Sequence, residues 1–171
     1  MLYAHFPNSI RPLVLLLALL TTLTTACKKS GSSADADPRD PYVGTYDCGY
    51  TTVSLVNNGP RFNPDETGKV SVVVTKAQAS DQIYIEETFP SGTKVNVTAQ
   101  LTNNTFKVID KANDTIAFGG QNYNGDYTAT GQFTPDSNNN NALTIIITSV
   151  STAIAQGVTL TRTGSITGPK K

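Results

Sequence analysis

The chain contains few of the side chains from which most active sites are built. Its 171 residues include one histidine, His5, two cysteines and no tryptophan. His5 lies in an N-terminal segment that we expect to be removed on export, so the folded part would contain no histidine. Without histidine there is neither a Ser-His-Asp nor a Cys-His pair for nucleophilic catalysis, and the usual Cys/His zinc site is excluded. We therefore expect no enzyme activity, no metal and no cofactor.

An excess of charge of one sign is also lacking. Lys and Arg together number 13, as do Asp and Glu, and they form no basic patch or run. Phosphate binding needs clustered Lys and Arg, so we expect no nucleic acid as a partner.

Paired carboxylates could still hydrolyse a glycosidic bond, but the sequence offers no suitable pair. Glu86 and Glu87 are adjacent on an expected strand, so their side chains point to opposite faces. Glu87 follows Ile83 and Ile85, which we expect to face inward. Two interpretations of Glu87 stay open: a strand-end charge that faces water, or an inward carboxylate that hydrogen-bonds a ligand at a barrel mouth.

The N-terminal apolar run, residues 12–20, is too short for a transmembrane helix, which needs about 20 apolar residues. Arg11 precedes the run, and the small-residue stretch LTTAC follows it and ends at Cys27. This order is typical of a secretory signal. The four residues before Cys27, Leu-Thr-Thr-Ala, resemble a bacterial lipoprotein signal. The resemblance implies a signal peptide over residues 1–26 and a lipid on Cys27; the alternative is an ordinary secreted chain in which Cys27 has no role.

Residues 27–41, CKKSGSSADADPRDP, have no apolar periodicity and predict a flexible tether. Lys28 and Lys29 after the lipidation position, with acidic residues further on, resemble lipoproteins of the Bacteroidetes group. In that group such residues can direct a lipoprotein to the cell surface. The resemblance implies an exported protein that is attached to the outer membrane by its N-terminal lipid, either in the periplasmic leaflet or on the cell surface.

From residue 41 onward, apolar and polar residues alternate at period two. In residues 92–101, GTKVNVTAQL, every second residue from Val95 to Leu101 is apolar, as in a half-buried strand. Similar segments recur along the chain, separated by turn sequences such as NNGP and PSG. We count eight or nine strands and no helical pattern, which indicates an antiparallel sandwich or barrel. We predict an all-β fold, a single up-and-down barrel of about eight strands, because closure removes exposed sheet edges.

We expect the barrel domain to span residues 42–165 and a short tail to follow at 166–171. The first strand contains Cys48, which has no partner within the chain if Cys27 carries a lipid. No neighbouring cation would lower the pKa of the Cys48 thiol. We therefore predict that Cys48 is buried and unreactive.

Two short motifs, VGTY in the first strand and LTRT in the last, resemble the lipocalin-like (calycin) family. In that family Gly-x-Trp opens the first strand, and an arginine from the last strand packs across the indole and closes one end of the barrel. The resemblance implies that Gly44 and Tyr46 form the opening motif and that Arg162 closes the barrel. A cation over an aromatic face gains about 0.5–2 kcal/mol. The alternative is that Arg162 marks the solvated end of a strand. The same region is similar to small barrel domains of Bacteroidetes lipoproteins.

Two functions stay open at the level of sequence. The first is a binding module, because an eight-stranded barrel is just wide enough for side chains or one small ligand. We expect a small apolar ligand in that case, faced by aromatic residues of the inner rows: Tyr127, Phe106, Phe118 and Phe133. The second is a structural or interaction module of the envelope, with a fully packed interior and loops that contact another envelope protein.

A further motif concerns modification. Asp114-Thr115-Ile116 matches the Asp-Ser/Thr-aliphatic pattern by which exported Bacteroidetes proteins resemble O-glycosylated ones. Thr115 is therefore a candidate glycosylation site, and the alternative is that the motif only starts a strand.

Overall fold

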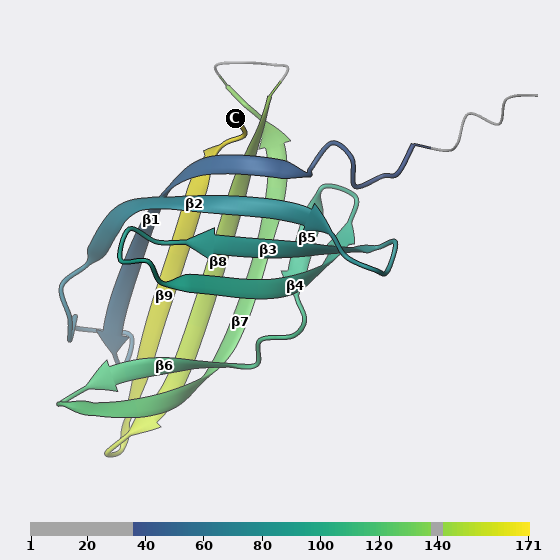
Figure 1. Cartoon of the computed structure of the whole chain (residues 1–171). Coiled ribbons are helices and arrows are strands. Elements are labelled where there is room, and N and C mark those ends of the chain that lie inside the picture. Colours follow the sequence, from purple (N-terminus) through teal and green to yellow (C-terminus); the bar gives the residue numbers. More distant parts are fainter. Residues whose placement is uncertain (1–35, 138–141) are drawn as a thin grey trace, which may run out of the picture. The chain divides into compact units, whose positions relative to one another are not determined.

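The computed structural model describes residues 36–137 and 142–171, and these residues form nine β-strands (Figure 1). The strands are β1 (Gly44–Val56), β2 (Glu66–Lys76), β3 (Gln82–Thr88), β4 (Lys94–Thr102), β5 (Thr105–Val108), β6 (Asn113–Phe118), β7 (Gln121–Pro135), β8 (Leu143–Ala155) and β9 (Val158–Pro169). Within the described ranges, no helix has the length and apolar character that a membrane crossing requires.

All strand pairs are antiparallel, in the order β5-β4-β3-β2-β1-β9-β8-β7-β6. A further pairing of β5 with β7 closes eight of the strands into a ring. Most neighbours in the ring are also neighbours in sequence, and the β1–β9 pairing joins the first strand to the last. The prediction of an all-β, up-and-down barrel of about eight strands is confirmed.

The sixth strand lies outside this ring. The long strand β7 pairs along one edge with two different strands, with β6 over residues 121–126 and with β5 over residues 130–132. Beyond the end of β5, the Asp110 carboxylate accepts the backbone N–H of Thr98 on β4 at 2.8 Å. In Figure 1, β6 stands apart from β4. No ladder joins β4 to β6 among the described residues, so hydrogen-bonded closure is confined to one part of β7.

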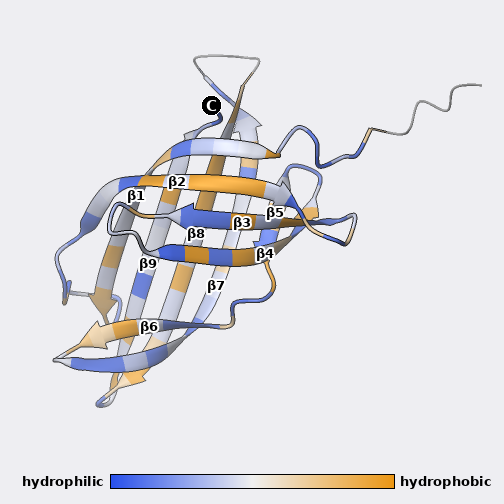
Figure 2. Ribbon diagram, viewed as in Figure 1, coloured by the Kyte–Doolittle hydropathy of each residue, from blue (hydrophilic) through white to orange (hydrophobic). Residues whose placement is uncertain are grey.

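Two apolar clusters occupy the interior. What we call the larger cluster is centred on Tyr46, Val72, Ile85, Phe133 and Ile145. The smaller cluster consists of four buried residues, Ile116, Ala153, Ala155 and Leu160, with half-buried aromatic residues around them. The period-two alternation that builds both clusters is visible along β4 as alternating colours in Figure 2.

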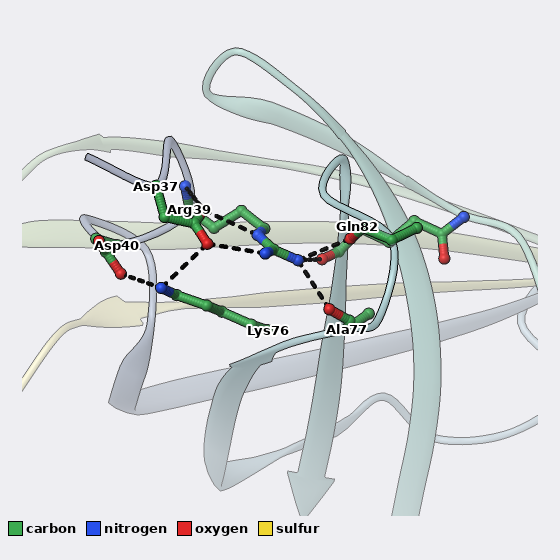
Figure 3. A network of polar contacts seen from close by, with 7 residues as sticks. Asp37, Arg39, Asp40, Lys76, Ala77 and Gln82 are labelled. Atoms are coloured by element: carbon green, nitrogen blue, oxygen red, sulfur yellow. Dashed lines mark hydrogen bonds and ion pairs between the residues drawn. The ribbon is translucent and has the colours of Figure 1, made fainter. Parts of the chain in front are cut away.

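The chain is ordered earlier than predicted, because residues 37–41 of the expected tether belong to the barrel unit. Arg39 is 8% exposed, and its Nη1 donates hydrogen bonds to the carbonyl oxygens of Ala77, Ala79 and Gln82 at 2.7–3.1 Å (Figure 3). These carbonyls lie in and beside the β2–β3 turn and need donors, which a guanidinium supplies. The predicted tether is therefore wrong for its last five residues. Composition could not reveal the role of Arg39, because the segment is polar and has few apolar residues.

A second set of contacts holds the same segment. Asp37 accepts hydrogen bonds from the Arg39 side chain at 2.8 and 2.9 Å, and its carboxylate lies 3.1 Å from Lys76 Nζ. Lys76 also pairs with Asp40 (Figure 3). The hydrogen bonds from Arg39 hold the pKa of Asp37 well below its usual range. The start of the barrel unit is therefore fixed to the end of β2 by charge pairs.

At the other end, residues 166–169 continue β9 instead of starting the predicted tail. Ile166 is buried and pairs with Tyr50 on β1 and with Ile147 on β8. Pairing on both sides holds this stretch in the sheet even though its sequence, Thr-Gly-Pro after Ile166, has no strand pattern of its own.

Candidate functional site

Next to the larger cluster the barrel contains a cavity of about 430 Å³, which is partly open to solvent because exposed residues such as Ser91 and Thr93 belong to its lining. The inner row of β8 explains why space is left: Ile145 and Ile147 fill the larger cluster, but Ser149 and Ser151 follow them before Ala153. Small side chains in a row of larger ones leave volume unfilled. The cavity lies within the size range of small-molecule sites, about 300–1,000 Å³.

Glu87 on β3 lines this cavity and is 9% exposed. It is the next inward residue after Ile83 and Ile85, so of the two interpretations of Glu87 the structure supports the inward carboxylate. Burial raises the pKa of Glu87 from 4.5 to about 7, although the charge of Lys111 opposes the shift. None of the described residues donates a hydrogen bond to Glu87 or forms an ion pair with it.

Lys111 and Tyr127 lie on another part of the lining. Lys111 Nζ is 4.1 Å from the centroid of the Tyr127 ring, a cation–π contact, and 3.5 Å from Asp114 Oδ1. Burial, with the nearby Glu87 and Asp114 charges, raises the pKa of Tyr127 to about 12. Tyr127 is therefore a neutral hydroxyl at any ordinary pH.

A third group of polar side chains joins β6, β8 and β9 at the cavity. Ser151 Oγ donates a hydrogen bond to Asp114 Oδ2 at 2.9 Å. Arg162 lies 3.8 Å from Asp114 and 3.7 Å from Glu66, both too long for hydrogen bonds. In the described ranges no group of three or more His, Cys, Asp or Glu side chains is arranged to hold a metal ion.

The predicted packing of Arg162 on Tyr46 is wrong. Arg162 is paired with Ser54 on β1, whereas Tyr46 forms a bridge with Lys170. Eight residues of chain, about 26 Å at roughly 3.3 Å per residue, separate Arg162 from Lys170. The reason is the antiparallel register, which places the start of β1 beside the end of β9, while Arg162 is near the start of β9.

The opening motif of the first strand has a packing role instead. Tyr46 is fully buried against Phe133, with ring centroids 6.0 Å apart, and its hydroxyl donates to the carbonyl of Tyr42 at 2.7 Å. At Gly44, a Cβ atom would lie 2.6 Å from the Lys170 side chain, so glycine leaves room for that lysine. Gly44 and Tyr46 thus belong to one end of the barrel, without a contribution from Arg162.

Three of the four aromatic residues predicted to face a ligand are instead packed against other side chains. Phe106 and Phe133 are 3% and 1% exposed in the larger cluster, with centroids 5.3 Å apart. Gly131 makes their packing feasible, since a Cβ there would lie 2.2 Å from Phe106 Cζ. Phe118 packs edge-on against Phe62 in the smaller cluster. Of the four, Tyr127 alone lines the cavity.

The remaining predicted positions are placed as follows. Cys48 is 4% exposed and burial raises the pKa of its thiol to about 12, so the prediction of a buried thiol is confirmed. Thr115 is exposed on β6, and its glycosylation stays a prediction. Cys27, the signal peptide and most of the tether lie outside the described residues.

Sequence reasoning missed Lys111, Ser149 and Ser151 as parts of the site. A signal for the two serines was present: along β8 the inner row changes from isoleucine to serine and then to alanine. Lys111 gave no signal, because it lies in a connection between two short strands where no alternation marks a face.

The fold and the cavity define this protein as a small, closed antiparallel barrel with a polar interior site. No family model matches the chain, and no curated protein matches its sequence. The monomer form of the PknI sensor domain of M. tuberculosis is similar over 71% of this chain and 84% of its own, at 10% identity and a TM-score of 0.39. Two crystal structures of unknown function from Bacteroides ovatus are similar over 75% of this chain and 42% and 47% of their own chains, at 12% identity and TM-scores of 0.34 and 0.33. At these values the likeness transfers no property to this chain.

Proposed function

We propose that this protein is an exported, lipid-anchored module of the cell envelope that binds a small ligand in the barrel cavity. The observation that carries the proposal is the cavity of about 430 Å³ with Glu87 in its lining: the side chain is nine-tenths buried, and its carboxyl group faces the open space without a partner among the described residues. Burying a carboxyl group without a partner costs free energy, and such groups cluster at functional sites. A ligand would recover that cost.

The lining supports a polar ligand more than the apolar one that the inner rows suggested. The rings of Phe106, Phe118 and Phe133 are used in packing. The cavity is lined by charged groups and hydroxyls, among them Glu87, Arg162 and Ser149, together with apolar side chains such as Phe89, Val95 and Ile147. An apolar ligand would bury these polar groups without hydrogen bonds.

A thermal-shift screen on the full chain tests ligand binding, with Cys27→Ala to keep the protein unanchored. The compounds cover four classes: fatty acids, neutral sugars, organic anions and amines. A ligand at a hundred times its Kd stabilises by about 2.7 kcal/mol, which raises Tm measurably. Each hit is repeated on Ser149→Leu, which fills the cavity, and on Val150→Leu, a control on the outer face of the same strand.

We expect hits that Ser149→Leu abolishes and Val150→Leu retains. The absence of a shift in every class, or hits that are indifferent to Ser149→Leu, would overturn the binding proposal.

The anchoring part of the proposal is supported by the sequence features around Cys27. Cys27→Ala should move the protein from the membrane fraction to the soluble fraction of cells. A protein that stays with the membrane after this substitution would show that the lipid is not its anchor. Fractionation of inner and outer membranes, with protease treatment of whole cells, then distinguishes the periplasmic leaflet from the cell surface.

A second candidate is an interaction module of the envelope without a ligand. The observation that favours it is the complete burial of aromatic and aliphatic side chains in the larger cluster. This alternative predicts that the screen gives no hit and that Ser149→Leu leaves the biological function unchanged.

A further inference from the structure

We propose that the cavity selects small polar molecules that carry a protonated amine, with the carboxylate of Glu87 as the counter-ion. This inference rests on the proposed function, because it names the ligand class of the same site. It follows from the partners that each charged group of the lining has or lacks.

Glu87 is the group that lacks a partner. Its side chain is nine-tenths buried between the strand neighbours Val72 and Val95, and the cavity is the open space in front of it. A buried carboxylate needs donors or a positive charge to offset its lost hydration. An ammonium group supplies both, with three N–H donors on one charge.

Lys111 does not serve this purpose, although it is the cation whose charge acts on Glu87. Its Nζ lies over the Tyr127 ring at 4.1 Å and beside Asp114 at 3.5 Å, and it is not within ion-pair distance of Glu87. Lys111 therefore has partners of its own and does not pair with Glu87. A positively charged group of a ligand can occupy the position beside the Glu87 carboxylate.

The other charged groups of the lining compensate one another. Arg162 lies between Glu66 at 3.7 Å and Asp114 at 3.8 Å, and Lys111 lies beside Asp114. Two acids and two bases thus balance, and Glu87 is one acid in excess. A single positive charge on the ligand neutralises this excess, whereas an anion would add to it.

Hydroxyl groups surround the charged ones and favour a polar ligand. Four of them come from different parts of the lining: Thr52, Thr93, Ser149 and Ser165. A hydroxyl both donates and accepts, so it suits a ligand with hydroxyl groups of its own. We therefore choose a probe that combines several hydroxyls with one amine.

Three six-carbon polyols that differ at one end group test the inference: glucamine carries an amine, sorbitol a hydroxyl and gluconate a carboxylate. Calorimetric titration of the Cys27→Ala full chain at pH 8 should show that glucamine binds at least tenfold more tightly than the other two. Equal or tighter binding of sorbitol or gluconate would overturn the inference and leave the proposed function intact. If neither glucamine nor any amine of the thermal-shift screen binds while another class does, the inference fails alone. If nothing in any class binds, the proposed function fails too.

Adjacent glutamates provide a matched pair of variants. Glu87→Gln keeps the shape of the side chain and removes its charge, so we expect at least a tenfold loss of glucamine affinity and little change for sorbitol. Glu86→Gln alters the outer face of the same strand, where Glu86 pairs with Lys94 at 2.8 Å, and should leave both affinities unchanged. Urea titration of each variant verifies that it folds. Retained glucamine affinity in folded Glu87→Gln would overturn the inference.

Proton release gives a second readout. The charge of Lys111 acts on the pKa of Glu87, and the charge of Glu87 in turn raises the pKa values of Tyr127 and Cys48. Since the pKa of Glu87 is about 7, an ammonium that binds its carboxylate at pH 6 must displace a proton, whereas at pH 8 Glu87 is already mostly ionised. Titrations in two buffers of different ionisation enthalpy should show release near one proton at pH 6 and little release at pH 8. Binding without this difference would mean that the amine pairs with another group.

Discussion

The larger cluster and the cavity are adjacent regions of one barrel, built on the same strands, and they differ by a few inward residues. On β8 the row passes from Ile145 and Ile147 to Ser149 and Ser151. On β9 it passes from Ile166 through Gly164 to Arg162. The strand ladders differ as well, because β5 pairs with β7 beside the larger cluster, whereas among the described residues no ladder joins β4 to β6 beside the cavity. Side-chain volume and polarity act together with this gap in the ladder, so that one region is filled and the other is open.

The two regions also contribute differently to stability. In the larger cluster, the burial of apolar surface stabilises the fold by about 25 cal/mol for each Å² removed from water. At the cavity, burial of the Glu87 side chain raises the pKa of its carboxyl group to about 7, and none of the described residues offsets this cost with a hydrogen bond. We therefore expect the cluster to carry stability and the cavity to cost some of it, as functional sites commonly do. Four substitutions test this contrast.

The largest effect is expected in the larger cluster, from Phe133→Ala. Phe133 is 1% exposed and its ring contacts Tyr42, Tyr46 and Phe106, with centroids 4.5–6.0 Å apart. Loss of a buried phenylalanine costs about 3–5 kcal/mol. Urea titration measures the change, with Tyr84→Ala, 45% exposed on β3, as a control expected within about 0.5 kcal/mol. A loss below about 1 kcal/mol for Phe133→Ala would mean that the cluster is not tightly packed.

At the cavity we expect a change of stability in the opposite direction: Glu87→Gln should stabilise the protein at high pH. The folded protein keeps the Glu87 proton up to about pH 7, whereas an unshifted glutamate has a pKa of 4.5. The free energy of unfolding contributed by Glu87 therefore falls as the pH rises between these values. At about 1.4 kcal/mol per pKa unit, the total is roughly 3 kcal/mol.

Urea titrations of wild type and Glu87→Gln at several pH values measure this contribution. The variant should equal the wild type near pH 4 and exceed its stability above pH 8. The pH dependence that all other titratable groups contribute cancels in the comparison, because these groups are common to both proteins. A difference that does not change with pH would place Glu87 in contact with water.

A smaller effect is expected from Ser151→Ala, which removes a hydrogen bond at the edge of the cavity. Ser151 is 2% exposed and donates to Asp114 on β6. Loss of the bond should cost about 1 kcal/mol, with Thr148→Ala on the exposed face of β8 as the control. Hydrogen exchange should show the loss in β6, which among the described residues pairs with β7 alone. Unchanged protection in β6 would show that Ser151 does not hold that strand.

The class of fold was predictable from the sequence, and the interior site was predictable only in part. Alternation states which residues face inward, so it identified Glu87 as a candidate inward carboxylate, and the lack of a partner and of a neighbouring cation predicted Cys48 as a buried thiol. It does not state which strand stands opposite, because register depends on pairings between distant residues. For this reason Arg162 was assigned to the wrong end of the barrel, and Phe106 and Phe133 were assigned to a ligand although they pack on each other.

Arg162→Ala tests that correction and should give the smallest effect of the four. An arginine packed across Tyr46 would cost about 1–3 kcal/mol when removed. As placed here, its side chain is one-third exposed, and its two ion pairs are 3.7 and 3.8 Å long. Exposed pairs of this kind contribute about 0.2–1 kcal/mol. Urea titration should therefore show a loss below about 1 kcal/mol.

A double-mutant cycle of Arg162→Ala with Glu66→Gln separates the contribution of this ion pair from that of packing by the arginine stem. We expect a coupling free energy below about 0.5 kcal/mol between the two positions. A loss above about 1.5 kcal/mol for Arg162→Ala would require contacts that this arrangement does not contain. A small loss would agree with the position of Arg162 in the cavity wall, one-third exposed and beside Glu66 and Asp114.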